Sequence, residues 1–185
     1  ESKREIKQIY TPLHGVGKKV FLDVFEKAGF ENPTVVESQA EPDPDFPTVS
    51  FPNPEEEGAL DLAVGLAIEK NADLVIANDP DADRLAIVAR HGNKWRHLNG
   101  NEIGVLLAEH ILSKEQGEDR LVVTTVVSSR LLSKIADFHK VKYAETLTGF
   151  KWIVRPGIED KSSRFVFGYE EALGFALGDS VRDKD

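Results

Sequence analysis

The alternation of predicted strands and helices is the feature that most restricts the fold of this 185-residue chain. A strand, a turn, a helix and a second strand follow one another at 6–38. The same order recurs at 121–147, without convincing sequence identity between the two segments. Further strands are predicted at 72–77 and 84–89, and a last strand runs into a loop over 164–175. Strands that alternate with helices form largely parallel sheets with helices on their faces. We therefore predict an α/β fold of two similar three-layer domains, each with a mixed, mostly parallel sheet flanked by helices.

A division between the two domains is predicted near residues 92–99, where the first group of strands ends and before a new helix begins at 101–113. We describe the domains as residues 1–95 and 96–185. An extended loop at 39–54 contains five prolines, which exclude a central strand or a helix interior there.

Helices are also predicted at 18–30, 55–70 and 128–140. Five apolar residues of the first share one helical face, namely Val20, Phe21, Val24, Phe25 and Ala28. The turn before this helix contains His14, but it matches neither a Walker loop nor G-x-G-x-x-G, because Val20 occupies the last glycine's place. A structural turn is therefore expected there.

Composition excludes several classes of function. Without cysteine, the chain can form neither disulfides nor thiolate sites. Its formal net charge of −9 argues against a general nucleic-acid or membrane surface, and no run of 18 apolar residues marks a membrane span. We expect no nucleic-acid partner, no membrane partner and a cytoplasmic location. The chain lacks methionine and begins with Glu1, so we expect it to be a piece of a longer protein.

The segment 78–84, which reads Asn-Asp-Pro-Asp-Ala-Asp-Arg, places three aspartates within five positions between two apolar strands. Like charges this close repel one another, so water, a basic partner or a metal ion must compensate them. Pro80 restrains the backbone, so the carboxylates of Asp79, Asp81 and Asp83 can converge on one point. Carboxylate oxygens suit Mg²⁺. An ordinary aspartate-rich turn is the alternative that the spacing leaves open, because Asp and Pro favour turns.

Two other classes of acidic loop fit the segment less well. An EF-hand loop that starts at Asp79 requires glycine at its sixth place and glutamate at its twelfth, where this chain has Arg84 and Arg90. A phosphatase of the haloacid dehalogenase type also carries Asp-x-Asp after a strand. It needs Thr or Val and then Gly next, whereas Ala82 and Asp83 follow here. That phosphatase class is kept as the weaker alternative.

Several segments, in the right order, resemble the α-D-phosphohexomutase family, which includes the phosphoglucomutases and phosphomannomutases. Residues 78–89 resemble the family's Asp-x-Asp-x-Asp-Arg metal-binding loop and the strand after it. Residues 146–153 and 168–175 resemble the substrate loops of its third domain, and 10–17 and 43–56 resemble its second domain. The resemblance spans nearly the whole chain and is nearest to the long phosphoglucomutases related to phosphopentomutases.

In that family, a phosphoserine of the first domain transfers its phosphoryl group to a sugar phosphate. A bisphosphorylated sugar forms, reorients and returns its other phosphate to the serine. The resemblance implies that this chain is domains two and three of an enzyme that interconverts sugar 1-phosphates and 6-phosphates. Phosphomannomutase and phosphopentomutase are the alternatives within the family. The implied cofactors are Mg²⁺ and glucose 1,6-bisphosphate, and the implied partner is a sugar phosphate.

The phosphoserine loop, Ser-His-Asn-Pro in type, is not found in the sequence, and neither is the phosphate loop of the fourth domain. The resemblance therefore implies that the first and fourth domains are missing partners and that this piece alone is inactive. No residue is assigned as general acid or base.

The resemblance implies phosphate-side roles for five residues. Asp79, Asp81 and Asp83 would hold Mg²⁺. Arg84 would lie beside the same phosphate as a donor fork. Lys184 matches a lysine that lies near the transferred phosphate in the family.

The resemblance also implies a sugar-binding group. Thr148 and Gly149 match a turn whose backbone approaches the sugar, and Glu170 matches the carboxylate that contacts sugar hydroxyls. Ala172 stands where the family commonly has serine, so one hydrogen bond is lost and glucose and pentose phosphates both stay open. We expect the neighbouring Glu171 to be solvated.

Overall fold

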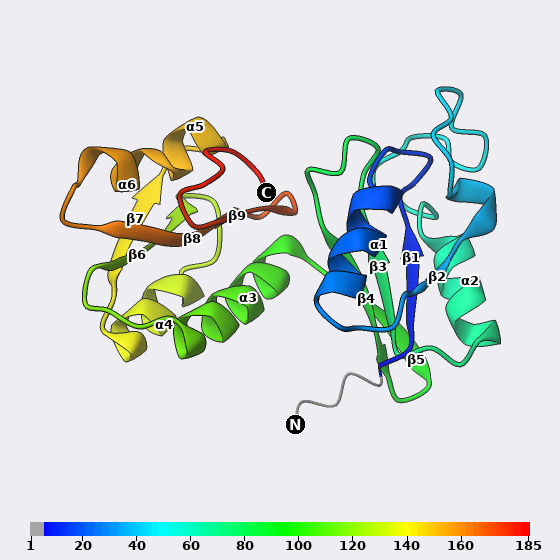
Figure 1. Cartoon of the computed structure of the whole chain (residues 1–185), viewed down its shortest axis with the longest axis horizontal. Coiled ribbons are helices and arrows are strands. Elements are labelled where there is room, and N and C mark those ends of the chain that lie inside the picture. Colours follow the sequence, from blue (N-terminus) through cyan, green and yellow to red (C-terminus); the bar gives the residue numbers. More distant parts are fainter. Residues whose placement is uncertain (1–5) are drawn as a thin grey trace. The chain divides into compact units, whose positions relative to one another are not determined.

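A computed structural model describes residues 6–185 and divides into two compact units between Leu98 and Asn99 (Figure 1). Each unit contains one β-sheet with flanking helices, so the predicted α/β class is confirmed. The predicted boundary after residue 95 falls inside β5 (Lys94–Leu98), which pairs with β4 (Ala86–His91) and therefore belongs to the first unit.

The remaining elements follow the alternation expected from the sequence. In the first unit they are β1 (Gln8–Thr11), α1 (Lys18–Lys27), β2 (Thr34–Val35), the 3-10 helix η1 (Glu37–Gln39), α2 (Asp61–Glu69) and β3 (Leu74–Ala77). In the second unit they are α3 (Gly100–Lys114), β6 (Arg120–Thr125), α4 (Leu131–His139), β7 (Lys142–Thr146), α5 (Phe150–Ile153), α6 (Arg155–Glu159), β8 (Arg164–Glu170) and β9 (Gly174–Leu177).

The sheet of the first unit has the strand order β2-β1-β3-β4-β5. β1 runs parallel to β2 on one side and to β3 on the other, while β4 and β5 continue the sheet as antiparallel strands. The chain passes from β1 through α1 to one neighbour and returns through α2 to the other. Because such crossovers are right-handed, the two helices cover opposite faces of the sheet.

The second unit repeats this wiring with the strand order β7-β6-β8-β9. β6 is parallel to both β7 and β8, and β9 is antiparallel to β8. Figure 1 shows α3 and α4 on one face of this sheet and α5 and α6 on the other. Both units are therefore three-layered, and each has two neighbouring parallel strands from which the chain departs in opposite directions.

These neighbouring strands end side by side. Thr11 of β1 pairs with Ala77 of β3, and Thr124 of β6 pairs with Tyr169 of β8. In open α/β sheets, ligands bind outside the carboxyl ends of strands at the point where the connections diverge. The loops that follow these four strands therefore form the candidate binding edge of each unit.

A buried apolar cluster lies next to the candidate binding edge of the second unit. Leu121 and Val123 of β6 pack with Phe150 and Ile153 of α5 and with Phe165 of β8, and all five are almost fully buried. Burial of such a side chain contributes about 1.5–3 kcal/mol. A helix as short as α5 is not stable alone, so this cluster holds it, and with it the turn that leads into it.

The first helix buries less than its apolar spacing predicted. No residue of α1 is buried, and Val20 and Val24 are 67% and 56% exposed. Instead, Phe21 stacks on Tyr10 of β1 with ring centroids 3.9 Å apart, and Phe25 stacks on Phe21 at 4.4 Å. An aromatic stack therefore attaches this helix to the sheet, and its valines face away from the core.

Two strands were not predicted. β5 is an edge strand whose residues are mostly exposed, so it lacks the apolar alternation that marks a strand. β9 follows β8 after a tight turn, in a segment that the sequence predicted as a loop. The predicted helix at 55–70 begins only at Asp61. No helix within residues 6–185 is both long and apolar enough to cross a bilayer.

Candidate functional site

The three aspartates predicted to converge do converge. They lie on the loop that joins β3 to β4, and one carboxylate oxygen from each of Asp79, Asp81 and Asp83 lies within 4.8 Å of the others. Asp79 is 6% exposed at the base of the loop, Asp83 is half-buried and Asp81 is exposed. The loop therefore presents a ring of oxygen atoms that is closed on the protein side and open towards solvent.

The charges of these three carboxylates are only partly compensated within the loop. Burial, followed by repulsion from Asp83 and Asp81, raises the pKa of Asp79 from 3.8 to about 6. A hydrogen bond from the backbone N–H of Arg84 to Asp79 Oδ1, at 3.0 Å, acts in the opposite direction but is too weak to cancel the rise. A group whose pKa is raised this far favours any cation that can share its oxygens.

Arg84 lies against the acidic loop, as expected. Its Nε is 3.3 Å from Asp79 Oδ2 and 4.0 Å from Asp83 Oδ1, and its Nη1 is 4.0 Å from Glu55 Oε2. The Nε is buried and makes no hydrogen bond to any described residue. This Nε therefore interacts with the two aspartates through charge and not through a hydrogen bond.

Asn78 closes the acidic loop, and sequence reasoning missed it. Its Oδ1 accepts a hydrogen bond from the hydroxyl of Tyr10 at 2.9 Å, and its Nδ2 donates to the backbone oxygen of Arg84 at 2.6 Å. One side chain therefore ties both ends of the loop to β1. The only sequence signal is an Asn before the first aspartate, which is also common in ordinary turns.

The turn after β1 packs directly against the backbone of the acidic loop. The backbone N–H of Val16 donates to the oxygen of Pro80 at 2.8 Å, and a Cβ on Gly15 would overlap the backbone of Pro80. Only glycine permits so close an approach of two backbones. The signal in the sequence was a glycine between two apolar elements, which a turn alone would also explain.

His14 has the structural role that was expected. It is 4% exposed, its Nε2 lies 2.7 Å from Thr48 Oγ1, and its backbone N–H donates to the oxygen of Gln39 at 3.0 Å. These contacts fasten the proline-rich loop to the binding edge. Leu13 and His14 both have positive φ angles, 46° and 60°, so the turn stores strain next to the acidic loop.

The donor set fits a hard divalent cation. It consists of carboxylate oxygens from three residues on one loop, it contains no sulfur or imidazole, and its most buried member has a raised pKa. Mg²⁺ takes a few carboxylates and completes an octahedron with water or phosphate oxygens. The exposed side of the ring leaves room for those further ligands.

The predicted sugar-binding residues also meet, at the binding edge of the second unit. The backbone N–H of Gly149 donates to Glu170 Oε2 at 3.2 Å. A Cβ added to Gly174 would lie 2.9 Å from Lys184 Cδ and 3.1 Å from Glu170 Cγ, so these two side chains flank the same bare backbone. Thr148 is exposed beside them. The fold therefore gathers a backbone donor, a carboxylate and an ammonium group.

The expectation that Glu171 is solvated is wrong. Its Oε2 accepts hydrogen bonds from Ser128 Oγ at 2.9 Å and from Thr125 Oγ1 at 3.2 Å. Asn101 extends this network by accepting the backbone N–H of Ser129 at 2.6 Å. Glu171 therefore clamps the loop after β6 to the loop after β8, a role that depends on residues more than 40 positions away.

Comparison with known proteins assigns both units. Residues 1–92 match the description "Phosphoglucomutase/phosphomannomutase, alpha/beta/alpha domain II", and residues 99–185 match "Phosphoglucomutase/phosphomannomutase, alpha/beta/alpha domain III". The two units are thus α/β/α domains of the class found in sugar-phosphate mutases. The chain belongs to the phosphoglucomutase/phosphomannomutase family, which confirms the resemblance.

Curated relatives carry three kinds of name. The chain is 48% identical over 184 residues to "Probable phosphomannomutase" of Haemophilus influenzae, covering 98% of this chain and 36% of the relative. It is 40% identical to a phosphoribomutase of Saccharomyces cerevisiae (96% and 31% covered) and 41% identical to a phosphoglucomutase of Staphylococcus epidermidis (98% and 34% covered). The chain therefore spans about a third of the length of these relatives.

Solved structures share the fold. A phosphoglucomutase/phosphomannomutase family protein from Burkholderia thailandensis matches with a TM-score of 0.77 at 20% identity, over 97% of this chain and 37% of that one. An N-acetylphosphoglucosamine mutase from Aspergillus fumigatus, solved in complex with GlcNAc-6P and magnesium, matches with a TM-score of 0.63 at 18% identity, over 94% and 34%. A second structure of that enzyme, with glucose 1,6-bisphosphate, has a TM-score of 0.60 at 16% identity, over 96% and 34%.

Proposed function

We propose that this chain supplies the cation-binding and sugar-binding domains of a phosphohexomutase that interconverts a sugar 1-phosphate and a sugar 6-phosphate. In this proposal the first unit, which ends at Leu98, carries the metal loop and the second, which begins at Asn99, carries the sugar loop. The phosphoserine and a further phosphate loop would come from parts of the protein outside this chain. The observation that carries the proposal is the convergence of three carboxylates within 4.8 Å, with the pKa of Asp79 raised to about 6.

The acidic loop would hold Mg²⁺ through Asp79, Asp81 and Asp83. When bound, Mg²⁺ would neutralise the charge of a phosphoryl group and polarise its oxygens. Arg84 would add a fixed positive charge beside that phosphate, since its guanidinium already lies 3.3 Å from Asp79. The magnesium in the Aspergillus fumigatus complex supports this choice of ion.

The second unit would orient the sugar. Glu170 would accept hydrogen bonds from vicinal hydroxyls while the backbone N–H of Gly149 holds its carboxylate in place. Lys184 flanks the same surface and would bring a positive charge towards the phosphate, and Thr148 would offer a hydroxyl at the rim. A bisphosphate such as glucose 1,6-bisphosphate would be the activator and intermediate.

We propose glucose phosphate as the substrate, with mannose and pentose phosphates as the alternatives. The relatives are named for mannose, ribose and glucose phosphates at 40–48% identity, so similarity alone does not separate the three. Ala172 has no hydroxyl and cannot discriminate between sugars by hydrogen bonding. The haloacid-dehalogenase alternative is a different class from the family to which the chain belongs.

The test uses the full-length parent protein with Mg²⁺, a trace of glucose 1,6-bisphosphate, and the 1-phosphates of glucose, mannose and ribose in separate assays. We expect isomerisation, fastest with glucose 1-phosphate. Asp81→Asn should lower the rate at least about a hundredfold, because a bound cation contributes several kcal/mol. Asp61→Asn, an exposed acid at the start of α2, is the matched control and should leave the rate unchanged. Release of inorganic phosphate without isomerisation would contradict the proposal.

A second test uses the chain alone. Three carboxylates without the phosphate ligand should bind Mg²⁺ weakly, because their repulsion is only partly compensated. We expect neither isomerisation nor phosphate release, and calorimetry should give a dissociation constant well above the micromolar range. Micromolar or tighter binding would show that the ring is a complete site without the rest of the protein.

A further inference from the structure

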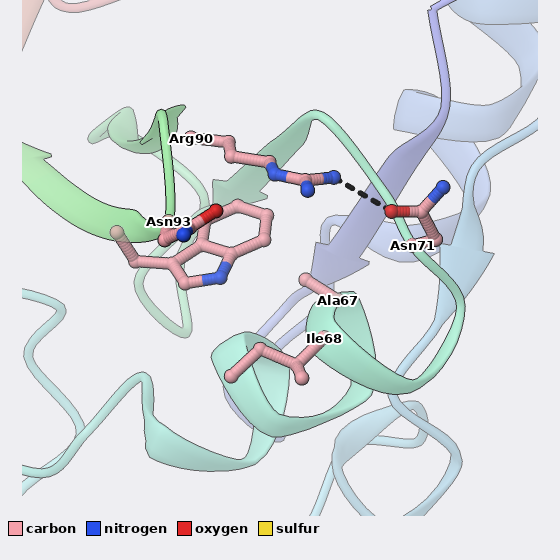
Figure 2. A pocket seen from close by; sticks show the side chains of 6 residues that line it. Ala67, Ile68, Asn71, Arg90 and Asn93 are labelled. Atoms are coloured by element: carbon pink, nitrogen blue, oxygen red, sulfur yellow. Dashed lines mark hydrogen bonds between the residues drawn. The ribbon is translucent and has the colours of Figure 1, made fainter.

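Another concave site lies in the first unit, at the end of the sheet opposite the acidic loop. It is a cavity of about 200 Å³ lined by Ala67, Ile68, Asn71, Arg90, Asn93 and Trp95 (Figure 2). The backbone N–H of Arg90 donates to the oxygen of Asp73 at the start of β3, whereas Asp79 follows the end of that strand. The length of β3 therefore separates the cavity from the metal loop, and its chemistry is independent of the proposed function.

The guanidinium of Arg90 is oriented, but its charge is not neutralised. Its Nη1 donates to Asn71 Oδ1 at 2.6 Å, as Figure 2 shows, and its Nε donates to the oxygen of Gly92 at 3.3 Å. None of the six lining residues is acidic, and within residues 6–185 no carboxylate forms an ion pair with Arg90. A pre-oriented guanidinium without an acidic partner is a donor fork for a carboxylate or a phosphate.

One wall of the cavity is apolar. Trp95 pairs directly with Arg90 across the β4–β5 ladder, so both side chains lie on one face of the sheet. Ile68, on the last turn of α2, is 63% exposed beside them. An indole and a branched aliphatic group next to a cation match a flat or apolar body that carries one negative charge.

The carbonyl groups at the C-terminal end of α2 do not prevent an anion from binding in this cavity. A helix C-terminus carries partial negative charge on its last carbonyls. In this chain the oxygen of Ala67 accepts the N–H of Ala72 at 2.8 Å, and the oxygen of Ile68 accepts the N–H of Asn71 at 3.2 Å. Asn71 has a φ of 50°, the left-handed conformation of a helix-terminating residue. These carbonyls are therefore already hydrogen-bonded to backbone N–H groups.

We propose that this cavity is a binding site for a small organic anion. The carboxylate or phosphate of the ligand would bind the guanidinium of Arg90, and its flat or apolar body would rest on Trp95 and Ile68. The amide of Asn93 would offer a further hydrogen bond at the rim. Pockets for drug-sized ligands occupy about 300–1,000 Å³, so this cavity of about 200 Å³ takes a smaller molecule, of the size of a single ring with one anionic group.

The chain contains its own control, because each of its two tryptophans lies near an arginine. Arg155 lies 5.3 Å from the ring centre of Trp152, but its Nε is paired with Glu159 at 2.5 Å. Lys151 Nζ also lies 5.7 Å from the centre of the Trp152 ring, so an anion that binds an unpaired guanidinium should shift Trp95 more strongly than Trp152.

The experiment follows the two indole N–H resonances by NMR during titration of the chain with benzoate, phenyl phosphate and neutral benzamide. We expect saturable shifts of Trp95 with at least one of the anions, with a dissociation constant of about 1 mM for ligands this small. A carboxylate preference or a phosphate preference then follows from which anion binds more tightly. The proposal would be overturned if neutral benzamide shifted Trp95 as much as the anions do, or if the anions shifted Trp152 as much as Trp95. It would also be overturned if neither anion shifted Trp95, and a protein segment would then be the remaining candidate occupant.

Arg90→Gln should weaken anion binding at least about tenfold, because a hydrogen bond to a charged group is lost. Arg90→Lys keeps the charge without the fork and should give an intermediate affinity. The NMR spectrum without ligand shows whether each variant keeps the β4–β5 hairpin folded. If the hairpin were unfolded, the indole resonance of Trp95 would already be shifted before any anion is added. If a folded Arg90→Gln protein bound the anions with unchanged affinity, the proposal that Arg90 binds them would be wrong.

Discussion

The two loops that follow the central strands β3 and β8 occupy the same place in the same wiring. Each joins a parallel strand to an antiparallel neighbour, each carries acidic residues (Asp79, Asp81 and Asp83 in the first unit, Glu171 in the second), and each contains a non-glycine residue with positive φ. That residue is Ala82 (61°) in the first unit and Leu173 (63°) in the second. A glycine approaches each loop closely, since a Cβ on Gly15 would overlap Pro80 and one on Gly100 would overlap Glu171.

The difference between the loops lies in how their acids are satisfied. In the first unit Asp79 repels Asp81 and Asp83, and its pKa is raised to about 6. In the second unit Glu171 accepts two hydroxyl hydrogen bonds. The acids of the first loop therefore repel one another, while the acid of the second is hydrogen-bonded and joins two loops. The same strand–loop–strand connection can carry either arrangement of acids, and the hydrogen-bond donors near the loop decide which one forms.

The largest expected effect is at the glycine contacts. Gly15→Ala places a methyl group against the Pro80 backbone and should lower the free energy of unfolding of the first unit by about 3 kcal/mol. Urea unfolding read from Trp95, with Trp152 replaced by Phe, measures this. Gly65→Ala on α2, where a Cβ meets nothing within 4 Å, is the control and should stabilise by about 0.5–1 kcal/mol. Equal effects of the two changes would contradict the close approach.

Next in size is the clamp in the second unit. Glu171→Ala removes the acceptor shared by the hydroxyls of Thr125 and Ser128. Because these hydroxyls lie 2.8 Å apart, one can then donate to the other, and the remaining donor loses its acceptor next to Thr125, which is 1% exposed. We expect a loss of about 1–3 kcal/mol in the free energy of unfolding, measured by urea unfolding read from Trp152. Glu118→Ala, an exposed acid on a loop, should change it by less than about 0.5 kcal/mol. A loss no greater than in that control would mean that the clamp does not hold the edge.

Removal of an acid in the first unit should have the opposite sign. The pKa of Asp79 is raised from 3.8 to about 6 in the folded chain, so folding favours the protonated form. The contribution of this group to stability is therefore full below about pH 4 and is lost as pH rises to about 6. Asp79→Asn removes that loss and keeps an oxygen for the N–H of Arg84. In metal-free buffer we expect the variant to gain about 2 kcal/mol over the original chain between pH 4 and pH 7.5.

The measurement is urea unfolding of both proteins in EDTA at several pH values, read from Trp95. Asp61→Asn on α2 is the control, because its carboxyl group is exposed. A difference between Asp79→Asn and the original chain that stays constant with pH would contradict the raised pKa. Addition of Mg²⁺ at pH 7.5 should reduce the advantage of the variant.

The smallest effect concerns the strained backbone. Ala82→Gly relieves a left-handed conformation that costs a residue with a Cβ about 1 kcal/mol, and it removes little buried surface. We expect a gain of about 0.5 kcal/mol in the first unit, because glycine is also more flexible in the unfolded chain. Leu173→Gly should instead destabilise the second unit, since that side chain is 2% exposed. A stabilising change at both positions would show that the two loops do not differ in packing.

Much of the site was predictable because it is local in sequence. Asp79, Asp81 and Asp83 lie within five positions of one another, so a single turn can bring them together. Glu170 and Gly149 were predicted only from the resemblance, since 21 positions separate them and no local rule joins them. Asn78 and Glu171 were missed for the same reason, because their partners lie 68 and 43 positions away.

The amino-acid sequence by itself determined the class of fold and the place of the acidic loop, because both follow from short-range patterns: apolar spacing, turn residues and a run of like charges. Only the tertiary structure decided which acid has a raised pKa and which is hydrogen-bonded, whether the valines of α1 are covered, and that Arg90 lines a cavity in which none of the six lining residues is acidic. Those outcomes depend on strand register and on which side chains, distant in sequence, come into contact in the folded chain. A pattern of neighbouring residues does not show which distant residues will be in contact, because those contacts form only when the chain folds.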